Sequence, residues 1–231
     1  MKRFYRDATV RPGPDGGEVL LDERPVKTPA RRALALPTEA LAKAVAAEWN
    51  AQGEDIRPRT MPLTGLANAA IDRVAPDPRA FAAGLARYAD SDLLCYRAES
   101  PEPLVERQAA AWDPVIAWAQ TRYDVHVEVT AGIVHRPQPP LTLQRLGDAI
   151  AAVEPFALAA CAPIVTITGS LLLCLALIEG SLTPDRAWTA AHVDEDWQAE
   201  MWGADALAEQ TRANRRAEFD AAVSFLSLSR A

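Results

Sequence analysis

The acidic, tryptophan-rich segment at residues 187–203 constrains the fold more than any other part of the chain. It contains three of the six tryptophans, Trp188, Trp197 and Trp202, together with four carboxylates. In a helix, which turns by about 100° per residue, Trp188 and Trp202 share one side and Trp197 lies on the opposite side. A helix that is apolar on two sides must be buried on both, or buried on one and offered to a partner on the other. We expect this helix to span residues 184–203.

Glu195 falls on the same side of that helix as Trp188 and Trp202, whereas Asp194, Asp196 and Glu200 occupy the flanks. A carboxylate among tryptophans must find a partner, ionise abnormally or contact a ligand. Three interpretations stay open. Glu195 forms a salt bridge with an arginine of the following helix (Arg212, Arg215 or Arg216), acts as the polar anchor of an apolar contact surface, or serves as a general acid. The third has no visible catalytic partner in the sequence.

The order of the remaining elements indicates an α+β fold, with an N-terminal β-rich domain and a larger C-terminal helical domain. Short strands are expected within residues 4–36, and Thr38 is expected to cap a first helix that ends near Gly53. A further strand is expected at 125–129. Helices are expected over residues 63–74, 78–90, 104–123, 143–153, 156–178, 184–203 and 205–226. We place the domain boundary at residue 60, which gives domains at 1–60 and 61–231.

The composition argues against several classes of partner. The 231 residues carry a formal net charge of −7, whereas nucleic acids and anionic membranes attract basic surfaces. The apolar stretch at 164–178 is too short to span a membrane, so we expect no membrane insertion. Three widely spaced cysteines, Cys95, Cys161 and Cys174, and the absence of a signal peptide or presequence indicate a reducing, cytoplasmic location.

The sequence offers little support for catalysis or for a cofactor. It contains no phosphate-binding loop, no dinucleotide-binding glycine motif and no serine nucleophile elbow. His192 and Asp196 lie one helical turn apart, but a zinc site needs three or four converging ligands. We therefore expect no metal and no cofactor. The alternative is a carboxylate- or metal-dependent hydrolase that uses His192, Glu195 and Asp196.

Nine segments, in order along nearly the whole chain, resemble one known family. They are LDERPVKTP (21–29), LPT (36–38), EWNAQ (48–52), MPLT (61–64), AIDR (70–73), SDLLCYRA (91–98), Gln108 with WDP (112–114), TGS (168–170), and VDEDWQ (193–198) followed by WG (202–203). Each segment alone is weak, but nine in register are specific. Together they are similar to the ATP-twelve family, chaperones that assemble the catalytic head of the proton-translocating ATP synthase.

The resemblance implies a non-enzymatic chaperone that binds the free α subunit of the ATP synthase and shields its apolar interface. It also implies that a carboxylate of the acidic segment is functional, for which Glu195 is the best match and Glu200 the alternative. Leu207 stands where the family pattern has an acid. The lack of a presequence is consistent with a bacterial, cytoplasmic member. The residues that we expect to contact the client are Glu195, Trp188, Trp197, Trp202, Asp194 and Glu200.

Overall fold

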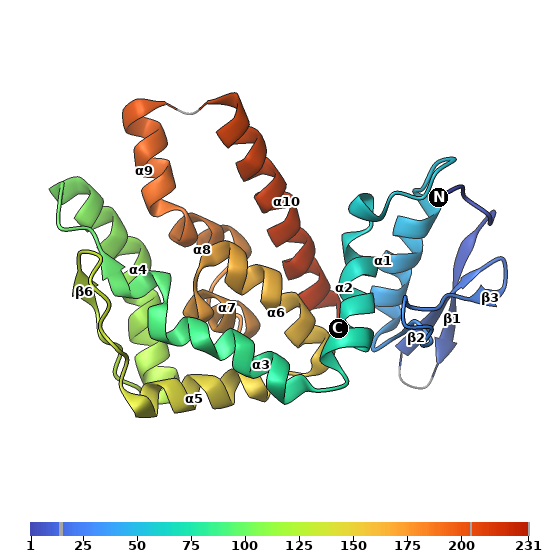
Figure 1. Ribbon diagram of the computed structural model, residues 1–231, viewed down its shortest axis with the longest axis horizontal. Coiled ribbons are helices and arrows are strands. Elements are labelled where there is room, and N and C mark those ends of the chain that lie inside the picture. Colours follow the sequence, from blue (N-terminus) through green and yellow to red (C-terminus); the bar gives the residue numbers. More distant parts are fainter. Residues whose placement is uncertain (14–15, 204, 231) are drawn as a thin grey trace. The chain divides into compact units, whose positions relative to one another are not determined.

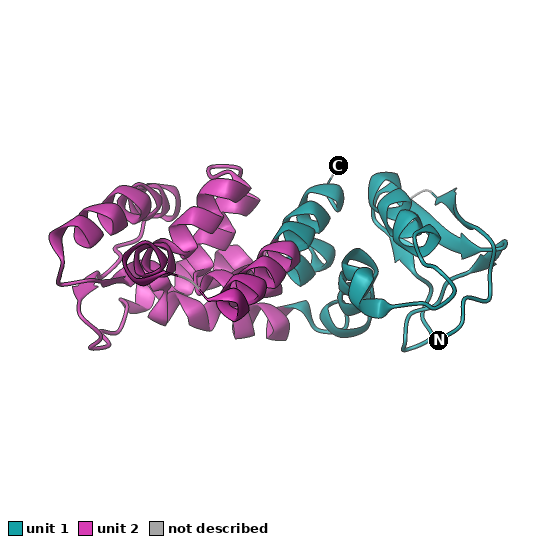
Figure 2. Cartoon of the chain, turned by 90° about the horizontal axis from the view of Figure 1, so that it is seen from above, with its two compact units in different colours: residues 1–78, 153–161, 220–231 teal, residues 79–152, 162–219 magenta. Residues whose placement is uncertain are grey.

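The computed structural model describes residues 1–231 apart from 14–15, 204 and 231 (Figure 1). A strand-containing N-terminal region precedes a larger helical part, which confirms the expected α+β class. The chain forms two compact units: residues 1–78, 153–161 and 220–231 make the first, and residues 79–152 and 162–219 make the second (Figure 2). Helices α6 (Pro155–Thr168) and α10 (Ala206–Leu228) each contribute to both units. The domains at 1–60 and 61–231 were expected as parts that fold independently, and this boundary at residue 60 remains a prediction.

The first unit contains an antiparallel sheet in which β2 is the central strand. The strands are β1 (Ala8–Gly13), β2 (Gly16–Leu21), β3 (Arg24–Pro25) and β4 (Ala35–Leu36). β2 pairs with each of the other three, and its Val19 and Leu21 are buried. Helix α1 (Glu39–Asn50) packs on β1 and β2. The Thr38 hydroxyl begins this helix by accepting a hydrogen bond from the Leu41 amide, which confirms the predicted cap.

Polar side chains at the end of α1 fasten the neighbouring backbone in this unit. The Asn50 amide donates to the carbonyl of Ala8 and accepts from its N–H, both at 2.8 Å. The Glu48 carboxylate accepts from the amides of Leu63 and Thr64, at the start of α2 (Pro62–Ala69). Both carboxylate oxygens thereby satisfy amides that a helix N-terminus leaves without partners. The segments at 48–52 and 61–64 therefore join α1 to α2.

The second unit is built mainly from helices. Helices α4 (Glu102–Tyr123), α7 (Leu171–Ile178) and α8 (Pro184–Ala191) pack against one another. The other helices of the chain are α3 (Pro78–Ala86), α5 (Pro140–Ala151) and α9 (Val193–Trp202). Short 3-10 or π turns lie at Pro58–Thr60, Ala70–Val74, Arg87–Ser91 and Leu93–Cys95. Among the residues that the structure describes, no helix has the combined length and apolar character that a membrane crossing requires.

Two elements expected from the sequence in this region differ in the structure. The helix expected over 156–178 is two helices, and the break lies at Gly169, whereas Pro163 is inside α6. Gly169 has φ +65°, a left-handed conformation that glycine adopts without strain. Ser170 then caps α7 by accepting from the Leu173 amide. The Gly-Ser pair ends one helix and begins the next.

The strand expected at 125–129 does not form, although Val125 and Val127 are buried as a strand would require. The side chain of Gln138 takes the place of a partner strand: its amide accepts from the Glu128 N–H at 3.0 Å and donates to the Glu128 carbonyl at 2.8 Å. Strand pairing begins only at Thr130, where β6 (Thr130–Ala131) runs parallel to β5 (Tyr96–Arg97). The alternation of apolar residues predicted the burial of Val125 and Val127, but not the 41% exposure of Val129 or the absence of strand pairing.

A fully buried carboxylate joins the 92–95 turn to α7. Asp92 accepts hydrogen bonds from the amides of Leu94 at 3.1 Å and Leu172 at 3.0 Å, and it also bonds Ser170. Burial raises the pKa of Asp92 from 3.8 to about 6, although these hydrogen bonds favour the charged form. The folded protein therefore binds one more proton than the unfolded chain between about pH 4 and pH 6.

We predict that Asp92 makes stability depend on pH. The folded pKa lies above the unfolded value, so its stabilising contribution is complete below about pH 4 and is lost as the pH rises through about 6. The free energy of unfolding of the wild type should fall by about 1 kcal/mol more than that of Asp92→Asn between pH 5 and pH 7. Urea denaturation at both pH values measures this difference. Parallel losses in the two proteins would contradict the prediction.

Candidate functional site

The acidic, tryptophan-rich segment is broken at His192, so the single helix expected over 184–203 is two helices, α8 and α9. The His192 Nδ1–H donates to the Trp188 carbonyl at 2.8 Å, and the imidazole stacks on the Trp188 indole with centroids 3.8 Å apart. Both side chains are buried. Desolvation lowers the pKa of His192, which favours the neutral imidazole. The break means that one helical projection cannot describe the whole segment.

One face of α9 is held by α4 through a buried glutamine. The Gln108 amide donates to Asp194 Oδ1 at 2.6 Å and accepts from the Ala98 N–H at 2.8 Å. One helical turn further along α4, the Trp112 Nε1–H donates to the Ala190 carbonyl at 2.7 Å. The Asp194 side chain therefore attaches the first turn of α9 to α4.

The same face of α9 continues with Trp197 and Glu200, which share one arginine of α4. The Arg107 guanidinium lies 4.9 Å from the centre of the Trp197 ring and forms an ion pair with Glu200 at 2.7 Å. A cation over an indole face is attracted by the ring quadrupole. Asp194, Trp197 and Glu200 thus follow the i, i+3, i+6 positions that face α4.

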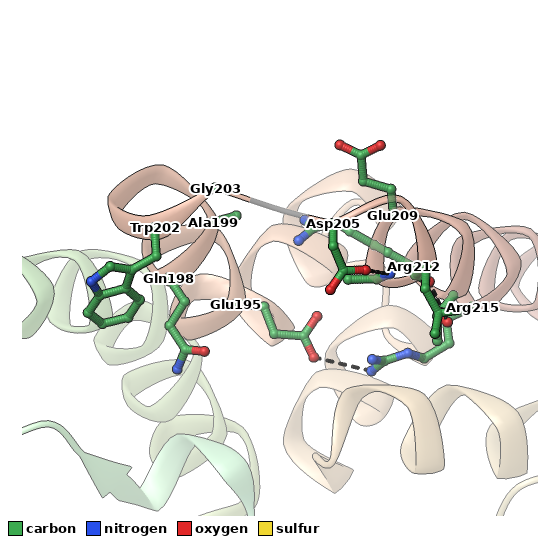
Figure 3. A pocket seen from close by; sticks show the side chains of 12 residues that line it. Glu195, Gln198, Ala199, Trp202, Gly203, Asp205, Glu209, Arg212 and Arg215 are labelled. Carbon is green, nitrogen blue, oxygen red and sulfur yellow. Dashed lines mark hydrogen bonds and ion pairs between the residues drawn. The ribbon is translucent and has the colours of Figure 1, made fainter.

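The opposite face of α9 looks toward α10 and carries Glu195. Figure 3 shows Glu195 reaching across to Arg215, and the two groups form an ion pair at 3.3 Å. The neighbouring arginines of α10 make similar bridges: Arg212 pairs with Asp196, and Arg216 pairs with Asp185 of α8 at 2.6 Å. The Glu195 and Arg215 side chains are 46% and 41% exposed. An exposed pair of this kind contributes about 0–1 kcal/mol.

A groove of about 550 Å³ separates α9 from the first turns of α10. Two large apolar side chains border it, Trp202 with 78% and Leu207 with 77% of its surface exposed. Met201, beside Trp202, is also exposed. The residues that line the groove are Glu195, Gln198, Ala199, Trp202, Gly203, Asp205, Leu207, Ala208, Glu209, Thr211, Arg212 and Arg215. Exposed apolar side chains beside charged groups are typical of a protein-binding surface.

The structure brings together only part of the residue set expected from the sequence. Glu195 and Trp202 both line the groove. Trp197 and Glu200 lie against Arg107, Asp194 bonds Gln108, and Trp188 is buried. Leu207 was noted in the sequence only as a departure from a family pattern, and Met201 was not singled out as a contact residue. The sequence feature that could have identified Met201 and Leu207 is a large apolar residue close to Gly203, between two segments rich in charged residues.

The residues of the alternative hydrolase do not converge. His192 Nδ1 is engaged by the Trp188 carbonyl, Glu195 by Arg215 and Asp196 by Arg212. Within the described part of the chain, no group of three or more His, Cys, Asp or Glu side chains could hold a metal ion. The hydrolase interpretation is therefore unsupported.

We predict that Gln108→Leu lowers the free energy of unfolding by about 1–3 kcal/mol, because it leaves the Ala98 amide and the Asp194 carboxylate without their buried partner. Gln144→Leu, at an exposed position of α5, is the matched control and should change stability by less than about 0.5 kcal/mol. Urea denaturation measures both. Equal effects would show that Gln108 does not hold α9 against α4.

Comparison with known proteins agrees with this architecture. The profile of the family described as ATP12 chaperone protein matches residues 2–120. The mitochondrial protein atp12 of Schizosaccharomyces pombe is 26% identical over 216 residues, which cover 87% of this chain and 74% of that protein. The crystal structure of Atp12 from Paracoccus denitrificans is 44% identical with a TM-score of 0.92, and the match covers 99% of this chain and 98% of that one.

A putative chaperone from Agrobacterium tumefaciens is 42% identical with a TM-score of 0.92, and the match covers 98% of this chain and 85% of that one. The profile match covers residues 2–78 of the first unit, α3 and most of α4, whereas the structural matches extend through α9 and α10. These findings confirm the resemblance drawn from the nine segments. The chain belongs to the ATP12 chaperone family, and its role is that of an assembly chaperone for the ATP synthase.

Proposed function

We propose that the protein binds the free α subunit of the ATP synthase catalytic head through the groove between α9 and α10. Binding would cover an apolar surface of the α subunit until its assembly partner replaces the chaperone. The protein would act by holding and releasing its client, without a chemical step, and in the cytoplasm. Membership of the ATP12 chaperone family supports this client assignment.

The observation that carries this proposal is the exposure of Trp202 at the groove that Glu195 also lines. Leaving an indole 78% exposed forgoes the favourable burial of a large aromatic surface. Such exposure is explained when a partner completes the burial, because tryptophan is among the residues that contribute most to binding free energy. Leu207 on α10 offers a second apolar contact across the same groove.

The six residues expected to contact the client would then divide into two roles. We propose that Glu195 and Trp202 touch the α subunit directly. Asp194, Trp197 and Glu200 would present them by holding α9 on α4. Trp188, packed against His192 and Phe219, would support α8 and α10 from within the second unit.

We predict that Trp202→Ala weakens binding to purified α subunit by at least about tenfold and leaves the thermal unfolding midpoint nearly unchanged, because the indole has few contacts to lose. Calorimetric titration gives the affinity, and light scattering gives the aggregation of α subunit with and without the chaperone.

Ile133→Ala is the matched control for this substitution. Ile133 is 96% exposed and belongs to the same unit, but it does not line the groove. It should leave affinity and protection at the wild-type level. Failure of the wild-type protein to bind the α subunit would reject the proposed function, and equal losses in both variants would reject the groove as the binding surface.

A further inference from the structure

The groove between α9 and α10 is lined by more acidic than basic side chains. Helix α9 carries Asp194, Glu195, Asp196 and Glu200 and no basic residue. Among the groove-lining residues, three are acidic, Glu195, Asp205 and Glu209, and two are basic, Arg212 and Arg215. Arg212 is already engaged by Asp196, which lies outside the lining. The acids at the groove therefore outnumber the guanidinium groups that are available to neutralise them.

The contact between Glu195 and Arg215 is the longest of the three ion pairs that connect α10 to α8 and α9 among the described residues. Its length is 3.3 Å, through one nitrogen and one oxygen, whereas Arg216 approaches Asp185 to 2.6 Å and the pair of Arg212 with Asp196 is closer still. Both groups are close to half exposed. Because water screens such a pair, breaking it costs about 0–1 kcal/mol, and another cation can replace Arg215.

Apolar and acidic surfaces occur side by side at this groove. Trp202 lies at the end of α9, two helical turns after Glu195, and both line the groove. Leu207 borders it from α10. The groove volume, about 550 Å³, is in the range of natural binding pockets and is large enough to receive side chains from a protein segment. A complementary segment would carry a bulky apolar side chain next to a cation.

We propose that the groove receives a segment of the client that presents a basic side chain beside a bulky apolar one, and that this basic side chain displaces Arg215 from Glu195. The inference rests on the proposed function, since it describes how the α subunit would be recognised. A guanidinium fits this site well, because it can bond both oxygens of a carboxylate where Arg215 bonds one. Glu195 is then a recognition residue whose internal partner keeps it in place until the client arrives.

The exchange gives the two members of the ion pair opposite effects on binding. Glu195→Gln removes the carboxylate that would bind the basic side chain of the client, and it should weaken the affinity for purified α subunit by about tenfold. Arg215→Gln removes the guanidinium that competes with the client for Glu195, and it should increase the affinity by about two- to fivefold. Glu179→Gln is the matched control, because Glu179 is a carboxylate of the same unit that pairs with Arg122 at 2.9 Å and does not line the groove, and it should leave the affinity unchanged.

Titration calorimetry with purified α subunit at two salt concentrations tests the proposal, with circular dichroism of each variant as a check on folding. Wild-type affinity should fall as salt rises, and the fall should be smaller in Glu195→Gln. Equal weakening by Glu195→Gln and Arg215→Gln would overturn the exchange, because the internal pair itself would then matter. Weakening by Arg215→Gln alone would also overturn it and indicate an acidic client segment. In both cases wild-type binding persists and the proposed function survives, whereas no wild-type binding rejects both.

Discussion

The attachment of α9 to α4 through the Gln108 side chain is the contact on which the candidate site depends. The amide is buried and satisfied at both ends, by the Ala98 N–H and by Asp194. It commits one face of a short, highly acidic helix to contact with α4. The other face is left for α10 (Figure 1). A helix of four carboxylates thereby acquires one structural side and one side that is available to a partner.

Local signals in the sequence predicted much of the fold. Thr38 begins its helix as expected, since a capping hydroxyl acts within a few residues. The continuity of elements was harder to predict. The break at His192 coincides with the stacking of its ring on Trp188, and in the segment at 125–129 the Glu128 backbone bonds the side-chain amide of Gln138 instead of a strand. Both are side-chain contacts that periodicity cannot reveal.

The candidate site was predictable in part for the same reason. Glu195 and Trp202 follow from the unusual composition of the segment, and Arg215 was among the possible partners of Glu195. The projection onto one continuous helix did not separate buried Trp188 from exposed Trp202, because the phase changes at His192. It also gave no sign that Asp194 and Glu200 point to α4 while Glu195 points to α10.

The exposure of Trp202 has a consequence for how the protein can be observed. Its indole is exposed, whereas Trp49, Trp112, Trp118, Trp188 and Trp197 are buried or half-buried. An indole in water emits fluorescence at longer wavelength than one inside a protein. The red edge of the intrinsic emission therefore reports mainly on the rim of the groove. The chain carries a built-in optical probe at the position where α9 ends.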